Sequence, residues 1–123
     1  MTSPFVFMDL RTTDLDRSRR FYSELFGWVV TDVPAGPATV PMFTAADGPW
    51  GGFTELGAGD QRLPQWIPYA PVTDLGAAVE YAVQLGAAVV RERVDLPQGS
   101  VAVVTDPGGA TVALWEPAPG TRP

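Results

Sequence analysis

The sequence predicts an α+β fold of two tandem βαβββ modules, and two observations carry this prediction. The first is an internal repeat, because Thr13-Asp14-Leu15 returns as Thr73-Asp74-Leu75, a spacing of 73 − 13 = 60. At the same spacing Phe21 matches Tyr81, Leu25 matches Leu85, and Val29-Val30 match Val89-Val90. The second is that each copy holds one segment of helical periodicity among segments of strand character. A chain of 123 residues, 46% of them apolar, is long enough to form one domain (1–123) around a core.

Each copy opens with a strand and a capped helix. The strands are expected at residues 5–12 and 66–72, followed by Asp14 and Asp74, whose side-chain oxygens are typical helix N-caps. Apolar residues then recur at helical spacing. They are Leu15, Phe21, Tyr22, Leu25 and Phe26 in the first copy, and Leu75, Ala78, Val79, Ala82, Val83 and Leu85 in the second. Gly27 and Gly86 follow the helices as left-handed C-caps.

Three strands are expected after each helix, separated by turn sequences such as Pro-Ala-Gly-Pro and Asp-Pro-Gly-Gly. Their predicted ranges are 28–33, 39–45 and 51–56 in the first copy, and 88–94, 100–105 and 111–116 in the second. Residues 57–65 therefore link a module of about residues 4–56 to one of about 66–117. The tail 117–123, rich in Pro and Gly, is expected to fray after the last strand.

The composition excludes several classes of protein. The chain has no His and no Cys, so it has no zinc finger, no catalytic Cys, no Ser-His-Asp triad and no His-ligated metal. Eight basic residues, all Arg, against 14 acidic ones give a net charge of −6. This charge disfavours nucleic acid and favours a cationic partner. We find no secretion signal and no apolar run of roughly 20 residues, so we expect a cytoplasmic protein without a membrane partner.

Several segments in register resemble one known family. Thr13–Trp28, with Phe21-Tyr22 and the ending Leu25-Phe26-Gly27, resembles the first helix of the vicinal oxygen chelate superfamily. Trp66-Ile-Pro-Tyr69 is similar to the opening of that family's second module, and Asp106-Pro-Gly-Gly to the turn before its last strand. The superfamily includes glyoxalase I, bleomycin and fosfomycin resistance proteins and extradiol dioxygenases. The resemblance implies a curved mixed sheet around a cleft, with the helices on its outer face, and a homodimer.

The resemblance also implies where metal ligands would lie. In metal-using members they lie on the floor of the cleft, and counting from Asp14, Asp74 and Asp106 assigns them to Phe7, Ile67 and Ala113, with a fourth near Phe53. None of these side chains offers a lone pair to a cation. We therefore expect no metal and no cofactor. Glu55 and Glu116 lie near the last strands and are the candidates for a displaced ligand.

Strand alternation then predicts the lining of the cleft, because residues that share parity with the ligand positions share a face. The predicted ligand-binding residues are Phe5, Phe7, Asp9, Phe53, Glu55, Gln65, Ile67, Tyr69, Ala113 and Trp115. Aromatic and polar side chains together are typical of a small-molecule site. Two interpretations stay open: an apolar cleft, or a floor filled by Phe7 and Phe53.

The expected function is non-catalytic binding of a small hydrophobic or cationic ligand, by stacking and cation–π contacts. This is the activity that the bleomycin resistance branch implies, where a drug or natural product is sequestered and antibiotic resistance results. One alternative is a metal-independent isomerase or cyclase using Asp9, Glu55, Tyr69 or Glu116 as acid or base. The others are a glyoxalase- or dioxygenase-type enzyme with displaced metal ligands, and a structural or regulatory dimer.

Overall fold

The computed structural model describes residues 3–119 and divides the chain into two compact units. One unit, called the first module below, is Phe7–Trp66. The other, the second module, is Ile67–Pro123 together with Met1–Val6, of which residues 3–6 and 67–119 are described. Residues 120–123 of the predicted frayed tail lie outside the described residues, as do residues 1–2.

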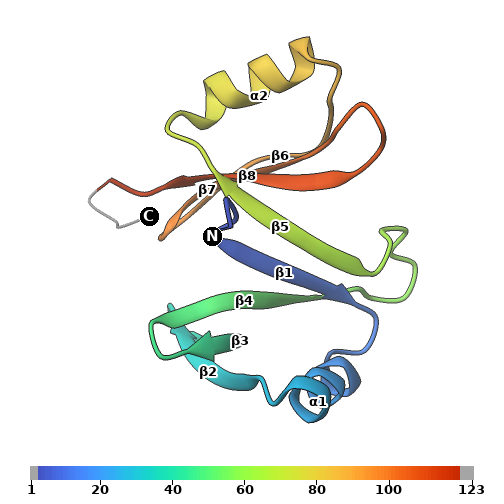
Figure 1. The fold of residues 1–123 in the computed structure, drawn as a ribbon, viewed down its shortest axis with the longest axis vertical. Coiled ribbons are helices and arrows are strands. Elements are labelled where there is room, and N and C mark those ends of the chain that lie inside the picture. Colours follow the sequence, from blue (N-terminus) through green and yellow to red (C-terminus); the bar gives the residue numbers. More distant parts are fainter. Residues whose placement is uncertain (1–2, 120–123) are drawn as a thin grey trace. The chain divides into compact units, whose positions relative to one another are not determined.

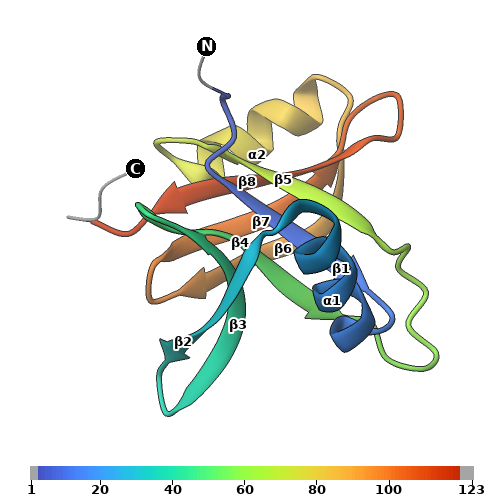
Figure 2. The same cartoon turned by 60° about the horizontal axis from the view of Figure 1, so that its bottom comes forward.

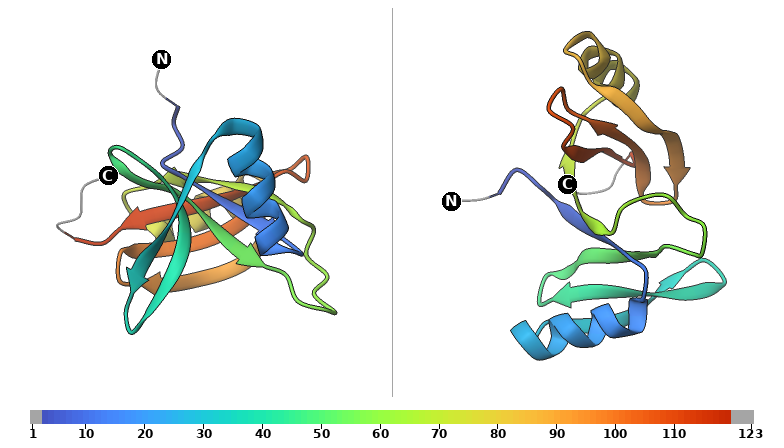
Figure 3. Two further views of the ribbon diagram at one scale, coloured as in Figure 1. Left: turned by 90° about the horizontal axis from the view of Figure 1, so that it is seen from below. Right: turned by 90° about the vertical axis from the view of Figure 1, so that its right-hand side faces the viewer.

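The first module contains β1 (Phe7–Thr12), α1 (Leu15–Phe26), β2 (Val29–Ala35), β3 (Ala38–Ala45) and β4 (Gly48–Glu55). Its strands follow the order β2-β3-β4-β1, in which β1 and β4 are parallel and the other neighbours are antiparallel. The helix α1 lies along one face of this sheet (Figure 3). Each strand of this module therefore has one face toward α1 and one face away from it.

The second module contains α2 (Leu75–Gln84), β6 (Ala88–Leu96), β7 (Gly99–Thr105), β8 (Thr111–Pro117) and all but the first two residues of β5 (Gln65–Pro71). Its strands follow the order β5-β8-β7-β6, with β5 and β8 parallel. The helix α2 packs across β6, β7 and β8 (Figure 2). Residues 3–6 join this module, since the Val6 N–H donates to the Tyr69 carbonyl at 2.9 Å. The predicted α+β fold of tandem βαβββ modules is confirmed (Figure 1).

Both helices begin at the predicted residues. The Asp14 carboxylate accepts a hydrogen bond from the Arg17 N–H at 3.1 Å, and the Asp74 carboxylate accepts one from the Ala77 N–H at 3.0 Å. Each bond satisfies a backbone donor that has no partner inside its helix. The repeated Thr-Asp-Leu motif is therefore a pair of helix starts.

The two helices end differently. Gly27 is the C-cap of α1, with φ +72°, a left-handed conformation that glycine adopts without a Cβ penalty. The C-cap of α2 is Leu85, and the left-handed glycine, Gly86, comes one residue later. Both glycines thus reverse the chain as predicted, one position apart in the repeat.

The strand bounds shift by a few residues from those predicted. β1 begins at Phe7, two residues late, and β4 begins at Gly48, three residues early. The early start of β4 follows from a tight hairpin, in which Ala45 pairs with Gly48. Neither helix in the described part of the chain has the length and apolar character needed to cross a bilayer.

Candidate functional site

The parallel pairing of β1 with β4 decides which residues of the first module share a face. Asp9 pairs with Gly52, and Leu10 pairs with Phe53. Paired residues of neighbouring strands point to the same side, so Gly52 shares the face of Asp9 and Phe53 does not. Side-chain contacts agree, because the Thr54 hydroxyl donates to the Asp9 carboxylate at 2.8 Å.

The prediction that Phe53 and Glu55 share a face with Phe7 and Asp9 is therefore wrong by one residue. A one-residue slip in a strand moves every side chain to the opposite face. The slip arises because the repeat spacing is not constant. It is 60 at the helix starts, but the equivalent pairs Asp9–Gly52 and Tyr69–Ala113 give 113 − 52 = 61 at the last strands.

The face of the first module that points away from α1 combines an aromatic ring with polar groups. Gly52 is buried against Phe7, and a Cβ built on it would lie 3.1 Å from Phe7 Cζ and 3.5 Å from Asp9 Oδ1. Phe7, Asp9 and Thr54 are themselves half-buried. We call Phe7, Asp9, Gly52 and Thr54 the β1–β4 face. It brings together two predicted site residues, Phe7 and Asp9, and two that the sequence analysis missed.

The opposite face, under α1, is filled by aromatic rings. Phe43 is fully buried at its centre, and five ring centroids lie 4.6–6.2 Å from that of Phe43. These rings belong to Tyr22, Trp28, Trp50, Phe53 and Trp66. The Trp66 indole N–H also donates to the Tyr22 hydroxyl at 3.0 Å. Phe53 is thus part of the packing beneath α1.

Trp50 reaches this cluster because of a β-bulge. Between Phe43 and Thr44 on β3, the pairing on β4 jumps from Gly51 to Pro49, which leaves Trp50 as an extra residue. A bulge re-aims the side chain that it carries. The Trp50 ring accordingly stacks on Phe43, at 4.9 Å and 19°.

Glu55 and Glu116 occupy equivalent places at the ends of β4 and β8. A Glu55 carboxylate oxygen accepts from the Leu15 N–H at 2.9 Å, and a Glu116 oxygen accepts from the Leu75 N–H at 2.7 Å. Each carboxylate therefore meets the positive N-terminal end of the helix in its own module. These glutamates are 116 − 55 = 61 residues apart. Treating them as equivalent positions of the repeat would have predicted Gly52 as the equivalent of Ala113.

The corresponding face of the second module is aliphatic. Ile67 and Ala113 are fully buried and pack with Val101 and Val103. Three partly buried side chains, Tyr69, Val94 and Trp115, pack against this cluster. Among the predicted site residues, the structure brings together Ile67, Tyr69, Ala113 and Trp115 in this way.

Trp115 has little freedom in this arrangement. A Cβ built on Gly99 would lie 2.7 Å from Trp115 Cζ2 and 2.5 Å from the Glu116 carbonyl oxygen. Only glycine has room there, so the Trp115 ring rests directly on the backbone of β7. The Trp115 ring also lies beside Tyr69, with the two ring centroids 6.0 Å apart.

Two predicted site residues lie outside these groups. Phe5 precedes β1 and is 41% exposed. Gln65 is the first residue of β5 and is half-buried. Whether any of the ten predicted residues touches a ligand stays a prediction.

The linker carries a forked ion pair. Arg62 donates to both carboxylate oxygens of Asp60, with the shortest N–O distance 2.6 Å. These hydrogen bonds lower the pKa of Asp60 to about 2 and raise that of Arg62. Weaker contributions come from Arg11 to Asp60 and from Asp9 to Arg62, so the linker charges act on β1.

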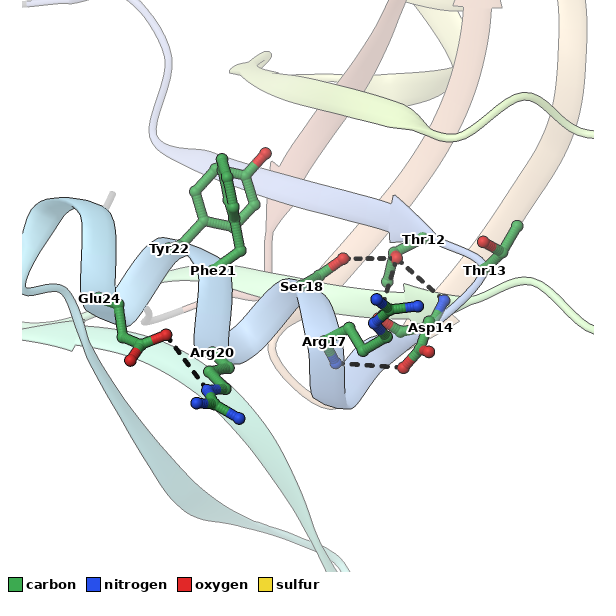
Figure 4. Close-up of a pocket in the computed structure, with 9 residues that line it drawn as sticks. All are labelled: Thr12, Thr13, Asp14, Arg17, Ser18, Arg20, Phe21, Tyr22 and Glu24. Atoms are coloured by element: carbon green, nitrogen blue, oxygen red, sulfur yellow. Dashed lines mark hydrogen bonds and ion pairs between the residues drawn. The ribbon is translucent and has the colours of Figure 1, made fainter.

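The N-terminal half of α1 borders an open groove of about 680 Å³ (Figure 4). Its polar atoms mostly serve the helix start. The Thr12 hydroxyl lies 2.6 Å from the Ser18 hydroxyl, and the Asp14 N–H donates to Thr12 Oγ1 at 3.1 Å. The groove thus borders the hydrogen bonds that fix the start of α1.

Comparison with known proteins identifies the family. Residues 5–115 match the glyoxalase-like domain family. The chain is a glyoxalase-like domain. It thereby belongs to the vicinal oxygen chelate superfamily, as the resemblance implied.

Two relatives share about a third of their residues with this glyoxalase-like domain. CFP32 of Mycobacterium tuberculosis, named as a candidate glyoxylase, is 34% identical over 114 residues, which are 89% of this chain and 44% of that protein. The anthracycline biosynthesis protein DauV of Streptomyces sp. strain C5 is 35% identical over 109 residues, 89% of this chain and 40% of that protein. The chain therefore spans less than half the length of these relatives.

A solved structure shows the same fold at lower identity. A variant of methylmalonyl-CoA epimerase from Streptomyces coelicolor, in complex with 2-nitronate-propionyl-CoA, superposes with a TM-score of 0.62. The match covers 100% of both chains at 15% identity. At this identity the likeness supports the fold alone.

The residues of this glyoxalase-like domain do not fit the metal site of its superfamily. With the corrected register, the four positions that the resemblance assigns to metal ligands hold Phe7, Gly52, Ile67 and Ala113, whose side chains carry no oxygen, nitrogen or sulfur. Divalent cations need several such donors. Within residues 3–119 no three acidic side chains gather where they could hold an ion. We therefore derive no chemistry through a metal.

Proposed function

We propose that this glyoxalase-like domain binds a flat, hydrophobic or cationic small molecule without transforming it. The observation that carries the proposal is the β1–β4 face, where an aromatic ring and a hydrogen-bonded carboxylate replace metal-ligand chemistry. The sequestration activity of the bleomycin resistance branch is the model for this function.

The chemistry of the face suits a ring that carries an amine. Phe7 offers an apolar aromatic surface, and Gly52 allows that ring to pack against the strand. Asp9 offers a negative charge, and the hydroxyl of Thr54 fixes the orientation of its carboxylate. A protonated amine beside a planar ring system would contact the carboxylate and the Phe7 ring together.

The anthracycline biosynthesis relative gives this ligand class a concrete example. Anthracyclines are planar fused-ring compounds, and many carry an amino sugar. At 35% identity to DauV, the chain is a reasonable host for a polycyclic aromatic natural product of this kind. The net charge of −6 also attracts a cationic ligand.

Calorimetric titration with an anthracycline amino glycoside tests the proposal, with mass spectrometry of the ligand before and after incubation. We expect saturable binding and an unchanged ligand mass. Asp9→Asn removes the charge but keeps an acceptor for Thr54, so it should weaken binding about tenfold. Asp47→Asn, in the exposed β3–β4 turn, is the matched control and should bind like the wild type.

Three outcomes separate this function from its alternatives. Absence of saturable binding contradicts it. Equal binding by wild type and Asp9→Asn would remove the carboxylate from the site. A ligand that returns with altered mass or rearranged bonds would favour the metal-independent isomerase or cyclase instead.

A further inference from the structure

A glycine occupies a position in the interior of β4 where the backbone does not require it. Gly52 is buried, and its φ lies outside the left-handed region that favours glycine. Glycine weakens the interior of a strand because it has no side chain to pack, and it often marks a place that another group approaches closely. The reason for a glycine at this position therefore lies in the atoms that surround it.

The neighbouring Gly51 shows what a purely structural reason looks like. A Cβ built on Gly51 would lie 3.0 Å from the Met8 carbonyl oxygen and 3.2 Å from Phe43 Cδ2, so this glycine makes room for the core under α1. A Cβ on Gly52 would instead meet only side chains of the β1–β4 face. These are the Phe7 ring at 3.1 Å and Asp9 Oδ1 at 3.5 Å. Gly52 thus touches both groups that the proposed function assigns to the ligand.

We propose that Gly52 determines ligand specificity by setting the spacing between the Phe7 ring and the Asp9 carboxylate. This inference rests on the proposed function, because it concerns the same face. A rigid fused-ring amine contacts the ring and the carboxylate together only at one spacing, whereas a flexible amine adapts to a range of spacings. The favoured ligand class is therefore a cation whose amine is held at a fixed distance from a fused ring system.

The carboxylate end of this spacing is fixed by β4 as well. The Thr54 hydroxyl donates to Asp9 Oδ2 at 2.8 Å, while Gly52 lies against Asp9 Oδ1. Asp9 is also the residue of β1 that pairs with Gly52. The two carboxylate oxygens therefore have different neighbours on β4, and both neighbours belong to the β1–β4 face.

A methyl group at position 52 would move the ring more than the carboxylate. Carbon atoms pack at about 3.5–4.0 Å, so the Phe7 ring, 3.1 Å from the added Cβ, would have to shift by about 0.4 Å or more. The 3.5 Å distance to Asp9 Oδ1 is already an ordinary contact, so the carboxylate keeps its place. Gly52→Ala therefore changes the spacing and keeps both recognition groups. Binding groups need placement to within about 0.5 Å, so this shift is enough to change which ligand fits.

Two isomers of aminoacridine test the spacing. Both are fused-ring cations of the same mass, but one carries the amine on the central ring and the other on an outer ring. Fluorescence titration of the wild type should give dissociation constants that differ about tenfold. Gly52→Ala should change their ratio by about fivefold or more. Gly57→Ala is the matched control and should keep the wild-type ratio, because Gly57 is exposed and a Cβ there meets no atom within 4 Å.

The outcomes distinguish this inference from the proposed function. If the wild type binds neither isomer and no anthracycline amino glycoside, the proposed function fails and this inference fails with it. If the wild type binds both isomers equally, the face binds ligands but does not select them by spacing, and only this inference is overturned. The same holds if Gly52→Ala keeps the wild-type ratio.

Circular dichroism checks that Gly52→Ala folds. If it does not, Thr54→Val decides, because it keeps the shape of the side chain and removes the hydrogen bond to Asp9. Without that bond the carboxylate can adjust to either isomer, so the ratio of the two dissociation constants should fall toward one. An unchanged ratio in Thr54→Val overturns the inference.

Discussion

The two modules share one topology but stabilise it with different side chains. The first module packs Phe43 and five further aromatic rings against α1. The second module instead packs the aliphatic residues Val101, Val103, Ile67 and Ala113 on the other side of its sheet. Of the four Trp residues, three lie in the first module's cluster, and the fourth, Trp115, packs in the second. A βαβββ unit therefore does not prescribe its core composition.

The comparison extends to the faces that would meet a ligand. The first module presents Phe7 with a polar pair, Asp9 and Thr54, whereas the second presents a closed aliphatic cluster partly covered by Tyr69 and Trp115. In both modules the first strand carries a large apolar side chain and the last strand a very small residue. Phe7 lies against Gly52, and Ile67 belongs to the same buried cluster as Ala113. The positions that the resemblance assigns to metal ligands thus hold one large and one very small apolar residue in each described module, and in the first module Asp9 and Thr54 lie beside them.

The largest effect should come from emptying the aromatic cluster. Phe43→Ala removes its central ring, and we expect a loss of about 4 kcal/mol in the free energy of unfolding. Val103→Ala, in the aliphatic cluster, removes two methyl groups and should cost about 2 kcal/mol. Urea denaturation followed by tryptophan fluorescence and circular dichroism measures both. Equal losses would show that the two cores contribute alike.

Two glycine substitutions compare how tightly the modules are packed. Gly99→Ala would press a methyl group against the Glu116 backbone and the Trp115 ring, at a cost of about 3 kcal/mol. In Gly52→Ala the methyl group would meet the Phe7 ring at 3.1 Å and Asp9 Oδ1 at 3.5 Å, which are side-chain atoms and not backbone, so about 1 kcal/mol is expected. Thermal unfolding of both variants checks the difference. A larger loss for Gly52→Ala would mean that Phe7 is held as firmly as Trp115.

These results bear on how much a sequence can predict. The helix starts at Asp14 and Asp74 and the left-handed Gly27 follow from local rules, and the structure confirms them. The face of Phe53 depends instead on how many residues the turns hold between β2 and β4, where one extra residue reverses the alternation. Local periodicity cannot supply that count.

Trp50 and Glu55 illustrate the same limit. Trp50 joins the aromatic cluster through a bulge, which has no local sequence signature here. Glu55 meets the start of α1 from 40 residues away in the sequence. Such contacts are made by the tertiary fold, so the candidate site was predicted for Phe7 and Asp9 but not for Gly52 and Thr54.

The helix-capping glutamates should differ in strength because their surroundings differ. Glu116 is half-buried and its bond to the Leu75 N–H is 2.7 Å long, whereas Glu55 is exposed and its bond to the Leu15 N–H measures 2.9 Å. We expect Glu116→Ala to cost about 1.5 kcal/mol and Glu55→Ala about 0.5 kcal/mol. The Gln variants keep an acceptor and serve as controls in the same denaturation series. A greater loss at Glu55 would contradict this ranking.

The smallest effects concern two ion pairs with the same spacing, Asp60–Arg62 in the first module and Arg93–Asp95 in the second. The pKa of Asp60 is lowered from 3.8 to about 2, first by the side-chain hydrogen bonds of Arg62. A depressed carboxyl pKa stabilises the folded state above pH 3.8, and this stabilisation is lost as the pH falls toward 2. Arg62→Gln should therefore raise the pKa of Asp60, followed by carboxyl NMR, most of the way toward 3.8, while the backbone N–H of residue 62 continues to lower it.

Asp95 should respond differently to loss of its arginine. Its pKa is lowered first by the Ser100 hydroxyl, which donates to it at 2.6 Å, and second by Arg93. We expect Arg93→Gln to leave the pKa of Asp95 partly lowered, and Ser100→Ala to raise it more. If Arg93→Gln instead restores an ordinary titration, the two ion pairs work alike. If the lowered pKa persists, the buried Ser100 hydroxyl is the main cause of the lowered pKa of Asp95, just as the Arg62 guanidinium is for Asp60.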